Sequence, residues 1–95
     1  MQFEWDAAKA TANLAKHGLA FSVAVRVFAD PHRLTVSDAR QDYGEARHNT
    51  IGQIETLAVV CVTHTDRAGI VRLISARPAS RKERNHYYVA RKNTP

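Results

Sequence analysis

The stretch Ile70–Tyr88, IVRLISARPASRKERNHYY, decides how this chain is organised. It begins as an apolar strand, breaks at Pro78 and continues into a strongly basic helix. Between Arg72 and Lys92 there are seven lysine or arginine residues and one acid, Glu83. The positive electrostatic field of these residues predicts an anionic partner, and we favour RNA. The alternative is a solvated basic surface that binds nothing.

The rest of the composition predicts one small domain that spans residues 1–95, because 44% of the 95 residues are hydrophobic, which is enough for a modest core. Its charge is uneven along the chain. Residues 1–48 carry six basic and six acidic groups, whereas residues 49–95 carry eight and three and supply the whole net charge of +5.

The single cysteine, Cys61, cannot form a disulfide within the chain and lies in the apolar run Leu57–Val62. We expect it to be a small buried residue in a reducing compartment. The N-terminus has acids where a signal peptide would have a basic and then an apolar segment, and no apolar run is long enough to span a membrane. These features predict a cytoplasmic protein without a membrane partner.

The N-terminal half predicts two helices. Phe3 and Trp5 alternate with polar residues, which indicates a short strand or an extended lead-in. Asp6 is a helix cap, residues 7–17 favour a helix, and Gly18 is a typical C-terminal stop. We expect a second helix over residues 23–29, capped by Ser22 and ended by Asp30-Pro31, although the β-branched residues there also allow a strand. A strand over 33–37 and a loop over 38–46 should follow.

The C-terminal half predicts three strands, over residues 47–54, 57–65 and 70–77, with a turn at 66–69. The middle strand opens as a continuous apolar run, as expected of a strand covered on both faces. Gly52 indicates a bulge or a bend. Ser80 and Glu83 form a capping box that starts a helix near Arg81. The resulting prediction is an α+β fold with an antiparallel sheet of about four strands, on which N-terminal helices and a C-terminal helix pack.

Several motifs make the sequence resemble the BrnT family, ribonuclease toxins of bacterial type II toxin–antitoxin systems. The first is W-D-x-x-K-x-x-x-N-x-x-K-H-G, which starts at Trp5 and ends at Gly18. The others are I-S-A-R at 74–77 and E-R-x-x-Y at 83–87. Phe3, Phe28, Asp30, Asp38, Glu45, Arg47, Gly52 and Ala79 extend the match over about residues 3–88.

The resemblance implies a RelE-like fold and RNA cleavage that inhibits translation. It also implies a stable complex with a BrnA-type antitoxin that carries a ribbon-helix-helix domain. Such a complex would bind operator DNA through the antitoxin. A two-fold antitoxin dimer would carry two toxins, giving a heterotetramer of two toxins and two antitoxins.

Metal-independent RNA cleavage needs a base for the 2′-hydroxyl proton, cations for the phosphorane charge and an acid for the leaving 5′-oxygen. Arg47, Arg77 and Arg84 are our candidates for the cations because guanidinium groups bind phosphate in a fork geometry. His17 is the candidate for proton transfer, since imidazole titrates near neutrality; the alternative is a histidine that only interacts with the helix dipole. Tyr87 either stacks on a base or completes the site, or it is a core residue.

The remaining basic residues are candidates for RNA binding: Lys9, Lys16, Arg72, Arg81 and Lys82. Five histidines, at 17, 32, 48, 64 and 86, lack metal-ligand spacing, so we expect no metal and no cofactor. A different class of function stays open, namely a catalytically silent module that acts with its antitoxin as a promoter corepressor. Growth arrest on expression without the partner separates the two.

Overall fold

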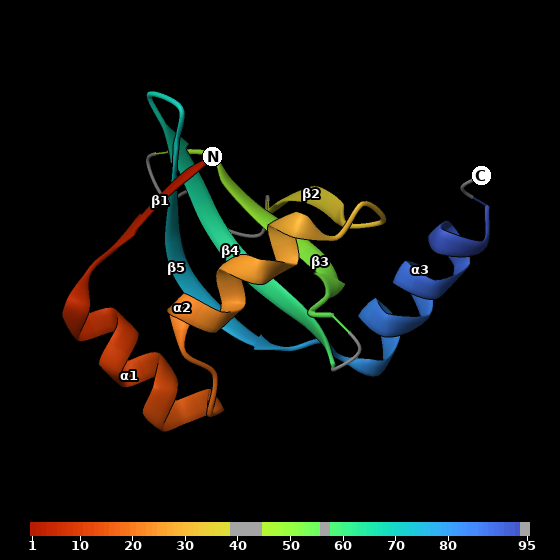
Figure 1. Cartoon of the computed structure of the whole chain (residues 1–95), viewed down its shortest axis with the longest axis horizontal. Coiled ribbons are helices and arrows are strands. Elements are labelled where there is room, and N and C mark those ends of the chain that lie inside the picture. Colours follow the sequence, from red (N-terminus) through yellow and green to blue (C-terminus); the bar gives the residue numbers. More distant parts are fainter. Residues whose placement is uncertain (39–44, 56–57, 94–95) are drawn as a thin grey trace.

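The computed structural model describes residues 1–38, 45–55 and 58–93 and contains a five-stranded sheet of order β1-β5-β4-β3-β2 (Figure 1). The pairs β2–β3, β3–β4 and β4–β5 are antiparallel, whereas β1 pairs with β5 in parallel. The strands are β1 (Gln2–Trp5), β2 (Leu34–Asp38), β3 (Arg47–Gln53), β4 (Val59–Arg67) and β5 (Ile70–Pro78). The helices are α1 (Ala7–His17), α2 (Phe21–Ala24), the 3-10 helix η1 (Val25–Ala29) and α3 (Arg81–Lys92).

The α+β class is confirmed, but the expectation of about four antiparallel strands is wrong. The additional strand is β1, in which Phe3 pairs with Val71 and Trp5 with Leu73. The alternation of residues 2–5 allowed a strand, but its parallel partner lies near the other end of the chain. Nothing local in the sequence indicated that pairing. The expected loop over 38–46 falls mostly outside the described residues.

The helix boundaries follow their capping residues where such residues exist. The Asp6 Oδ1 atom accepts a hydrogen bond from the Lys9 N–H at 3.0 Å, and Gly18 ends α1 with φ of 69°. In α3 the capping box is present: the Glu83 N–H donates to Ser80 Oγ at 3.2 Å and the Ser80 N–H donates to Glu83 Oε1 at 2.8 Å. Ser22 is not a cap, because α2 starts one residue earlier, after Ala20, and has no side-chain cap. After one α-helical turn, the valine-rich continuation tightens into η1.

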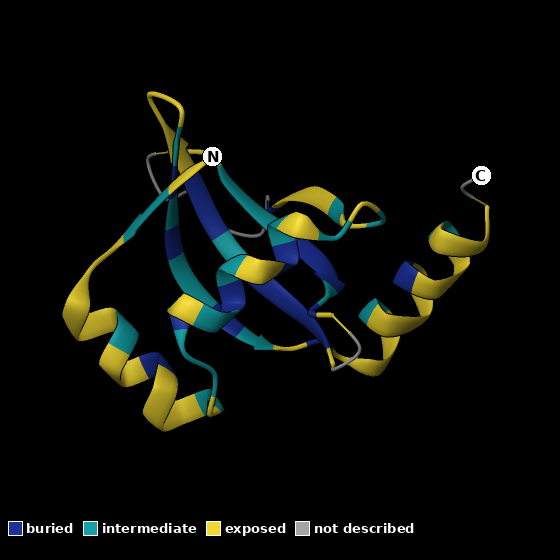
Figure 2. Ribbon diagram, viewed as in Figure 1, coloured by how far each residue is buried: buried dark blue, intermediate teal, exposed yellow. Residues whose placement is uncertain are grey.

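The sheet has a hydrophobic core on each face. Phe21, Ala24 and Val27 of α2 and η1 pack on one face, and Tyr87 of α3 packs with Ile51, Cys61 and their neighbours on the other. All four residues of Val59–Val62 on the central strand are buried, as predicted for a strand covered on both faces (Figure 2). Cys61 is buried, as expected.

Gly52 does not form a bulge, one of the two features that the sequence indicated, since it pairs regularly with Val60. Its role is close packing: a Cβ atom at this position would lie 2.8 Å from Val27 Cγ2, so only glycine lets η1 approach β3. The bulge lies instead between β4 and β5. There Thr63 pairs with Ser75 and His64 with Leu73, which leaves Ile74 as the extra residue.

A buried asparagine joins α1 to the edge of β5, beyond the end of β1. The Asn13 Nδ2 atom donates to the Ala76 carbonyl at 2.8 Å and to the Leu19 carbonyl at 2.9 Å. In return, the Ala76 N–H donates to Asn13 Oδ1 at 3.0 Å. The side chain thus pairs with β5 as a strand would, and it fixes the position of α1 beside the sheet. None of the helices in the described part of the chain is long and apolar enough to cross a membrane.

Candidate functional site: an open basic face of the sheet

The candidate site is the part of the α3-bearing sheet face that α3 leaves uncovered, which we call the open face. Strand register defines it, because paired residues share a face. The row Leu34–Ile51–Cys61–Arg77 runs across this side of the sheet, and all of it but Arg77 belongs to or packs against the core beneath α3. The next row, Val36–Asn49–Thr63–Ser75, is exposed or half-buried and almost entirely polar. Beyond it, Asp38 pairs with Arg47, Thr65 with Arg72, and Arg72 with Glu4.

Three predicted residues meet at one border of the open face. Lys9, Lys16 and His17 lie on one side of α1, where they line a pocket of about 270 Å³ together with Ile74 and Ser75 of β5. The bulge at Ile74 and the anchor at Asn13 set this arrangement. The pocket therefore combines two ammonium groups, an imidazole and a hydroxyl, which are groups able to bind a phosphate and to move a proton.

Arg77 borders the same face but is held by Glu83. Its Nη1 and Nη2 atoms donate to Glu83 Oε1 and Oε2 at 2.7 and 2.9 Å, and Nη1 also lies 3.3 Å from the Pro78 carbonyl. The Arg77 guanidinium, together with the Ser80 N–H, lowers the pKa of the Glu83 carboxyl to about 2. The pair fixes the guanidinium where strand β5 passes into α3, and it satisfies part of the hydrogen-bonding capacity that a phosphate would use.

The far end of the open face holds a cluster of three arginines, Arg47, Arg67 and Arg72, with three acids, Glu4, Asp38 and Glu45. Arg67 forms a two-point ion pair with Glu45, with its Nη2 and Nε atoms 2.8 and 3.2 Å from the carboxylate oxygens. Arg72 lies 3.5 Å from Glu4. Arg67, and to a smaller extent Arg47 and Arg72, lower the pKa of Glu45. The arginines and the acids of this cluster therefore balance in formal charge.

The predicted residues of α3 divide between surface and core. Arg81 and Lys82 are exposed in its first turn, and Arg84 Nη1 donates to the Ala79 carbonyl at 2.9 Å. Tyr87 is fully buried, and its hydroxyl donates to Asp30 Oδ2. Burial, followed by this hydrogen bond, raises the pKa of Tyr87 to about 12. Tyr87 thus has the core role, one of the two that the sequence left open, and does not reach the open face.

The structure therefore brings Lys9, Lys16 and His17 into one pocket and places Arg77 and Arg72 on the strand that forms its floor. Arg47 shares the face but lies two rows from Arg77, about 13 Å along the strands. These two arginines are suited to different phosphates of one strand, not to the same phosphate.

Sequence reasoning missed several polar partners on and near this face. The Glu83 carboxylate was recognised as a cap, but its ion pair with Arg77 crosses the turn at Pro78 and has no helical spacing that would indicate it. Thr63 Oγ1 donates to Asn49 Oδ1 at 2.7 Å, and Ser75 lies in the same row. Alternation along the strands could have placed these residues on one face, but only their register shows that they are neighbours.

A chain of hydrogen bonds on the other sheet face has the composition of a catalytic triad. His64 Nε2 lies 2.8 Å from Thr50 Oγ1, and His64 Nδ1 lies 3.2 Å from Asp66 Oδ1. Thr50 is fully buried, so its hydroxyl cannot reach a substrate. We therefore assign these three hydrogen-bonded side chains a structural role in the core. Among the described residues, no group of three or more histidine, cysteine, aspartate or glutamate side chains could hold a metal ion.

Comparisons with known proteins agree on one family. A family model described as "Ribonuclease toxin, BrnT, of type II toxin-antitoxin system" matches residues 5–83. The crystal structure of the Brucella abortus ribonuclease toxin BrnT is similar, with a TM-score of 0.65 and 26% sequence identity. That match covers 85% of this chain and 99% of the Brucella chain. No curated protein matches by sequence.

Proposed function

We propose a catalytic site for this chain, which belongs to the BrnT family of ribonuclease toxins of type II toxin–antitoxin systems. In our proposal residues 1–95 act as one RelE-like toxin unit in the cytoplasm. The open face binds single-stranded RNA, and the pocket beside α1 cleaves it without a metal ion or other cofactor. The observation that carries this proposal is that Lys9, Lys16 and His17 line one pocket on the floor formed by Ile74 and Ser75.

The proposed reaction is a transesterification. His17 takes the proton from a ribose 2′-hydroxyl, and the 2′-oxygen attacks the neighbouring phosphorus. The bond from phosphorus to the 5′-oxygen then breaks, and the leaving oxygen takes a proton from Lys16 or from water. Lys16 and Lys9 lie in the pocket with His17 and stabilise the charge on the phosphorane.

The arginines hold the RNA strand on either side of this phosphate. Arg72 and Arg77 lie on β5 beside the pocket and bind the adjacent phosphates. Arg47 binds the strand farther along the open face, and Arg81, Lys82 and Arg84 extend the positive field over the start of α3. Tyr87 positions α3 from beneath through Asp30 and does not stack on a base.

The partner is, in our proposal, a BrnA-type antitoxin with a ribbon-helix-helix domain. Two toxins and two antitoxins form a heterotetramer that binds operator DNA through the antitoxin. The antitoxin would inhibit the toxin by covering the open face, because no helix of the described residues covers the polar row Asn49–Thr63–Ser75.

The test is RNA cleavage by the purified, antitoxin-free chain, with and without EDTA, and by His17→Ala, Lys16→Gln and Arg77→Ala variants. We expect wild-type cleavage to persist in EDTA, and the loss of His17 or Lys16 to lower kcat by about a hundredfold or more. Arg33→Gln is the matched control, since this exposed residue lies outside the open face. Equal cleavage by all variants would show that the assigned site is not the catalytic one.

The silent-module alternative predicts no growth arrest when the chain is expressed without its antitoxin. Growth arrest that the His17→Ala variant abolishes supports the ribonuclease. If wild type and the His17→Ala variant both arrest growth, the toxicity does not depend on His17.

A further inference from the structure

The polar row Val36–Asn49–Thr63–Ser75 crosses the open face and starts at the pocket beside α1, because Ser75 also lines that pocket. Neighbouring strands lie roughly 4.8 Å apart, so Asn49 is two strands and about 10 Å from Ser75. A nucleotide on either side of a phosphate in the pocket can span this distance. The row is therefore within reach of the bases next to the cleaved bond.

A hydrogen bond within the row sets the orientation of Asn49. Thr63 Oγ1 donates to Asn49 Oδ1 at 2.7 Å, and both side chains are half-buried. The amide nitrogen is on the other branch of the side chain and is turned away from Thr63. In the described part of the chain no acceptor contacts Asn49 Nδ2, so its two N–H donors are left for a ligand.

An apolar side chain lies next to these donors. Val36 pairs with Asn49 across β2 and β3 and is 44% exposed. An unpaired base has the matching composition, since its ring face is apolar and its edge carries the hydrogen-bonding atoms. Such a base can cover Val36 while an acceptor on its edge binds Asn49 Nδ2.

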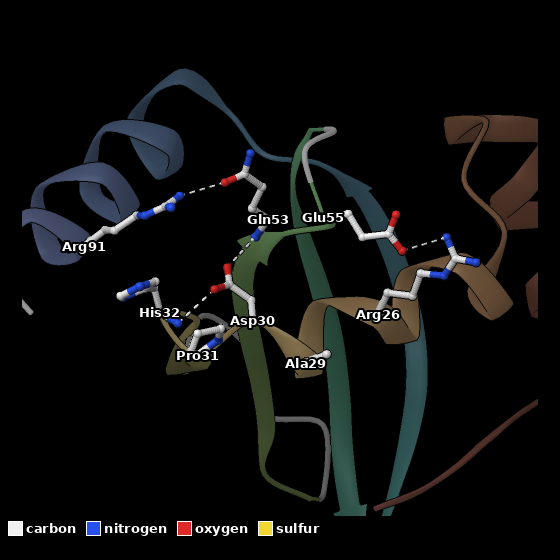
Figure 3. Close-up of a pocket in the computed structure, with 8 residues that line it drawn as sticks. All are labelled: Arg26, Ala29, Asp30, Pro31, His32, Gln53, Glu55 and Arg91. Atoms are coloured by element: carbon white, nitrogen blue, oxygen red, sulfur yellow. Dashed lines mark hydrogen bonds and ion pairs between the residues drawn. The ribbon is translucent and has the colours of Figure 1, made fainter.

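The larger pocket where η1, β3 and α3 meet, of about 410 Å³, offers RNA no comparable contact (Figure 3). Arg91 donates to Gln53 Oε1 at 2.8 Å, whereas Arg26 is turned to Glu55, 3.3 Å away. Asp30 and Glu55 offset the charges of the two arginines, so no net positive charge attracts a phosphate into this pocket. We therefore look for further RNA contacts on the open face itself.

We propose that Asn49 determines which bases this toxin accepts: its Nδ2 donates to a carbonyl oxygen of an unpaired base beside the cleaved bond. Guanine O6 and uracil O4 are acceptors at the position where adenine and cytosine carry an amino donor. The Oδ1 atom, which could accept from such an amino group, is engaged by Thr63. The substrate class is RNA with guanine or uracil at this position, and the inference rests on the proposed ribonuclease function.

The test measures binding of RNA that cannot be cleaved, so that it does not depend on catalysis. Short homopolymers of 2′-O-methyl uridine and of 2′-O-methyl cytidine carry the same charge and differ in the donor and acceptor pattern of the base edge. Fluorescence anisotropy with the whole chain gives a Kd for each strand. We expect wild type to bind the uridine strand about fivefold more tightly.

Asn49→Asp is the most informative variant. Aspartate has the same shape and still accepts from Thr63, but it presents an acceptor in place of the N–H donors, so the preference should reverse in favour of cytidine. The added negative charge weakens both strands, and the ratio of the two Kd values cancels it. Asn85→Asp, an equal change at an exposed position of α3, is the matched control and should keep the wild-type ratio.

Two further variants remove the parts of the proposed contact without adding charge. Asn49→Ala deletes the donors and should bring the two Kd values within about twofold of each other. Thr63→Val leaves the Asn49 amide free to turn over, so the preference should weaken. Should Asn49→Ala unfold, Asn49→Asp keeps the hydrogen bond to Thr63 and retains the test.

A wild type that binds the cytidine strand as tightly as the uridine strand would overturn the inference. So would a preference that Asn49→Asp leaves unchanged, or a failure to bind either strand. Cleavage of unmodified RNA by the same chains tests the ribonuclease separately. Cleavage that depends on His17 but shows no base preference keeps the proposed function and removes this inference, whereas a base preference without cleavage keeps the contact and removes the catalytic site.

Discussion

Replacing Glu83 by glutamine should isolate the contribution of its ion pair with Arg77. Glutamine at this position can still accept the Ser80 N–H in the capping box, so the helix start is kept and the charge alone is lost. The pKa of Glu83 is lowered from 4.5 to about 2, and at roughly 1.4 kcal/mol per pH unit this corresponds to about 3 kcal/mol as an upper bound. The two side chains are 36% and 22% exposed. Solvent screening therefore reduces the expected loss to about 1–2 kcal/mol.

The sign of the pH dependence follows from the direction of this shift. Because the folded-state pKa is depressed, the stabilisation is fully present above pH 4.5 and is lost as the pH falls towards 2. Urea unfolding should show wild type more stable than Glu83→Gln by about 1–2 kcal/mol at pH 7. The gap should shrink to roughly two fifths of that size at pH 3.

A matched control is Glu55→Gln, which removes the exposed pair with Arg26 and should change stability by less than about 0.5 kcal/mol. A gap between wild type and Glu83→Gln that is the same at pH 7 and pH 3 would refute the reasoning, since the loss would then not come from the charge. So would the absence of a gap at pH 7.

Other changes test the remaining parts of the fold. Asn13→Ala removes three hydrogen bonds and leaves Ala76 backbone groups unpaired, so urea unfolding should show a loss of about 2–4 kcal/mol; wild-type stability would show that α1 does not depend on this anchor. Gly52→Ala places a Cβ atom 2.8 Å from Val27 Cγ2, and thermal unfolding should show a loss of about 1–3 kcal/mol unless η1 moves freely. Burial lowers the pKa of His64, so stability should begin to fall as the pH drops below about 6.5, and His64→Gln should flatten that dependence. A pH profile unaltered by the substitution would assign the titration to another group.

The parts of the fold that the sequence predicted are those decided by neighbouring residues. The caps at Asp6 and at Ser80 with Glu83 were predicted because capping spans only three or four residues. The central strand was predicted because its apolar run needs cover on both faces. The pairing of β1 with β5 and the bulge at Ile74 depend on residues that are distant in sequence, and no local pattern reveals them.

The candidate site shows the same division. Lys9, Lys16 and His17 were separate candidates in the sequence, and their helical spacing of i, i+7 and i+8 brings all three to one pocket. The pocket opens beside Ser75 because the Asn13 side chain holds α1 against β5. Asn13 is buried, and its polar side chain gave no indication of this in the sequence. Arg77 was expected to be available to phosphate, whereas tertiary structure places a carboxylate against it.

The parallel pairing of β1 with β5 has a consequence for the timing of folding. Residues 2–5 leave the ribosome before their partners at 70–73, which are more than sixty residues later in the sequence. Until then β1 has no sheet to join, and the floor of the α1 pocket, which β5 supplies, does not exist. A nascent chain would therefore lack this pocket until β5 has been made and has joined the sheet.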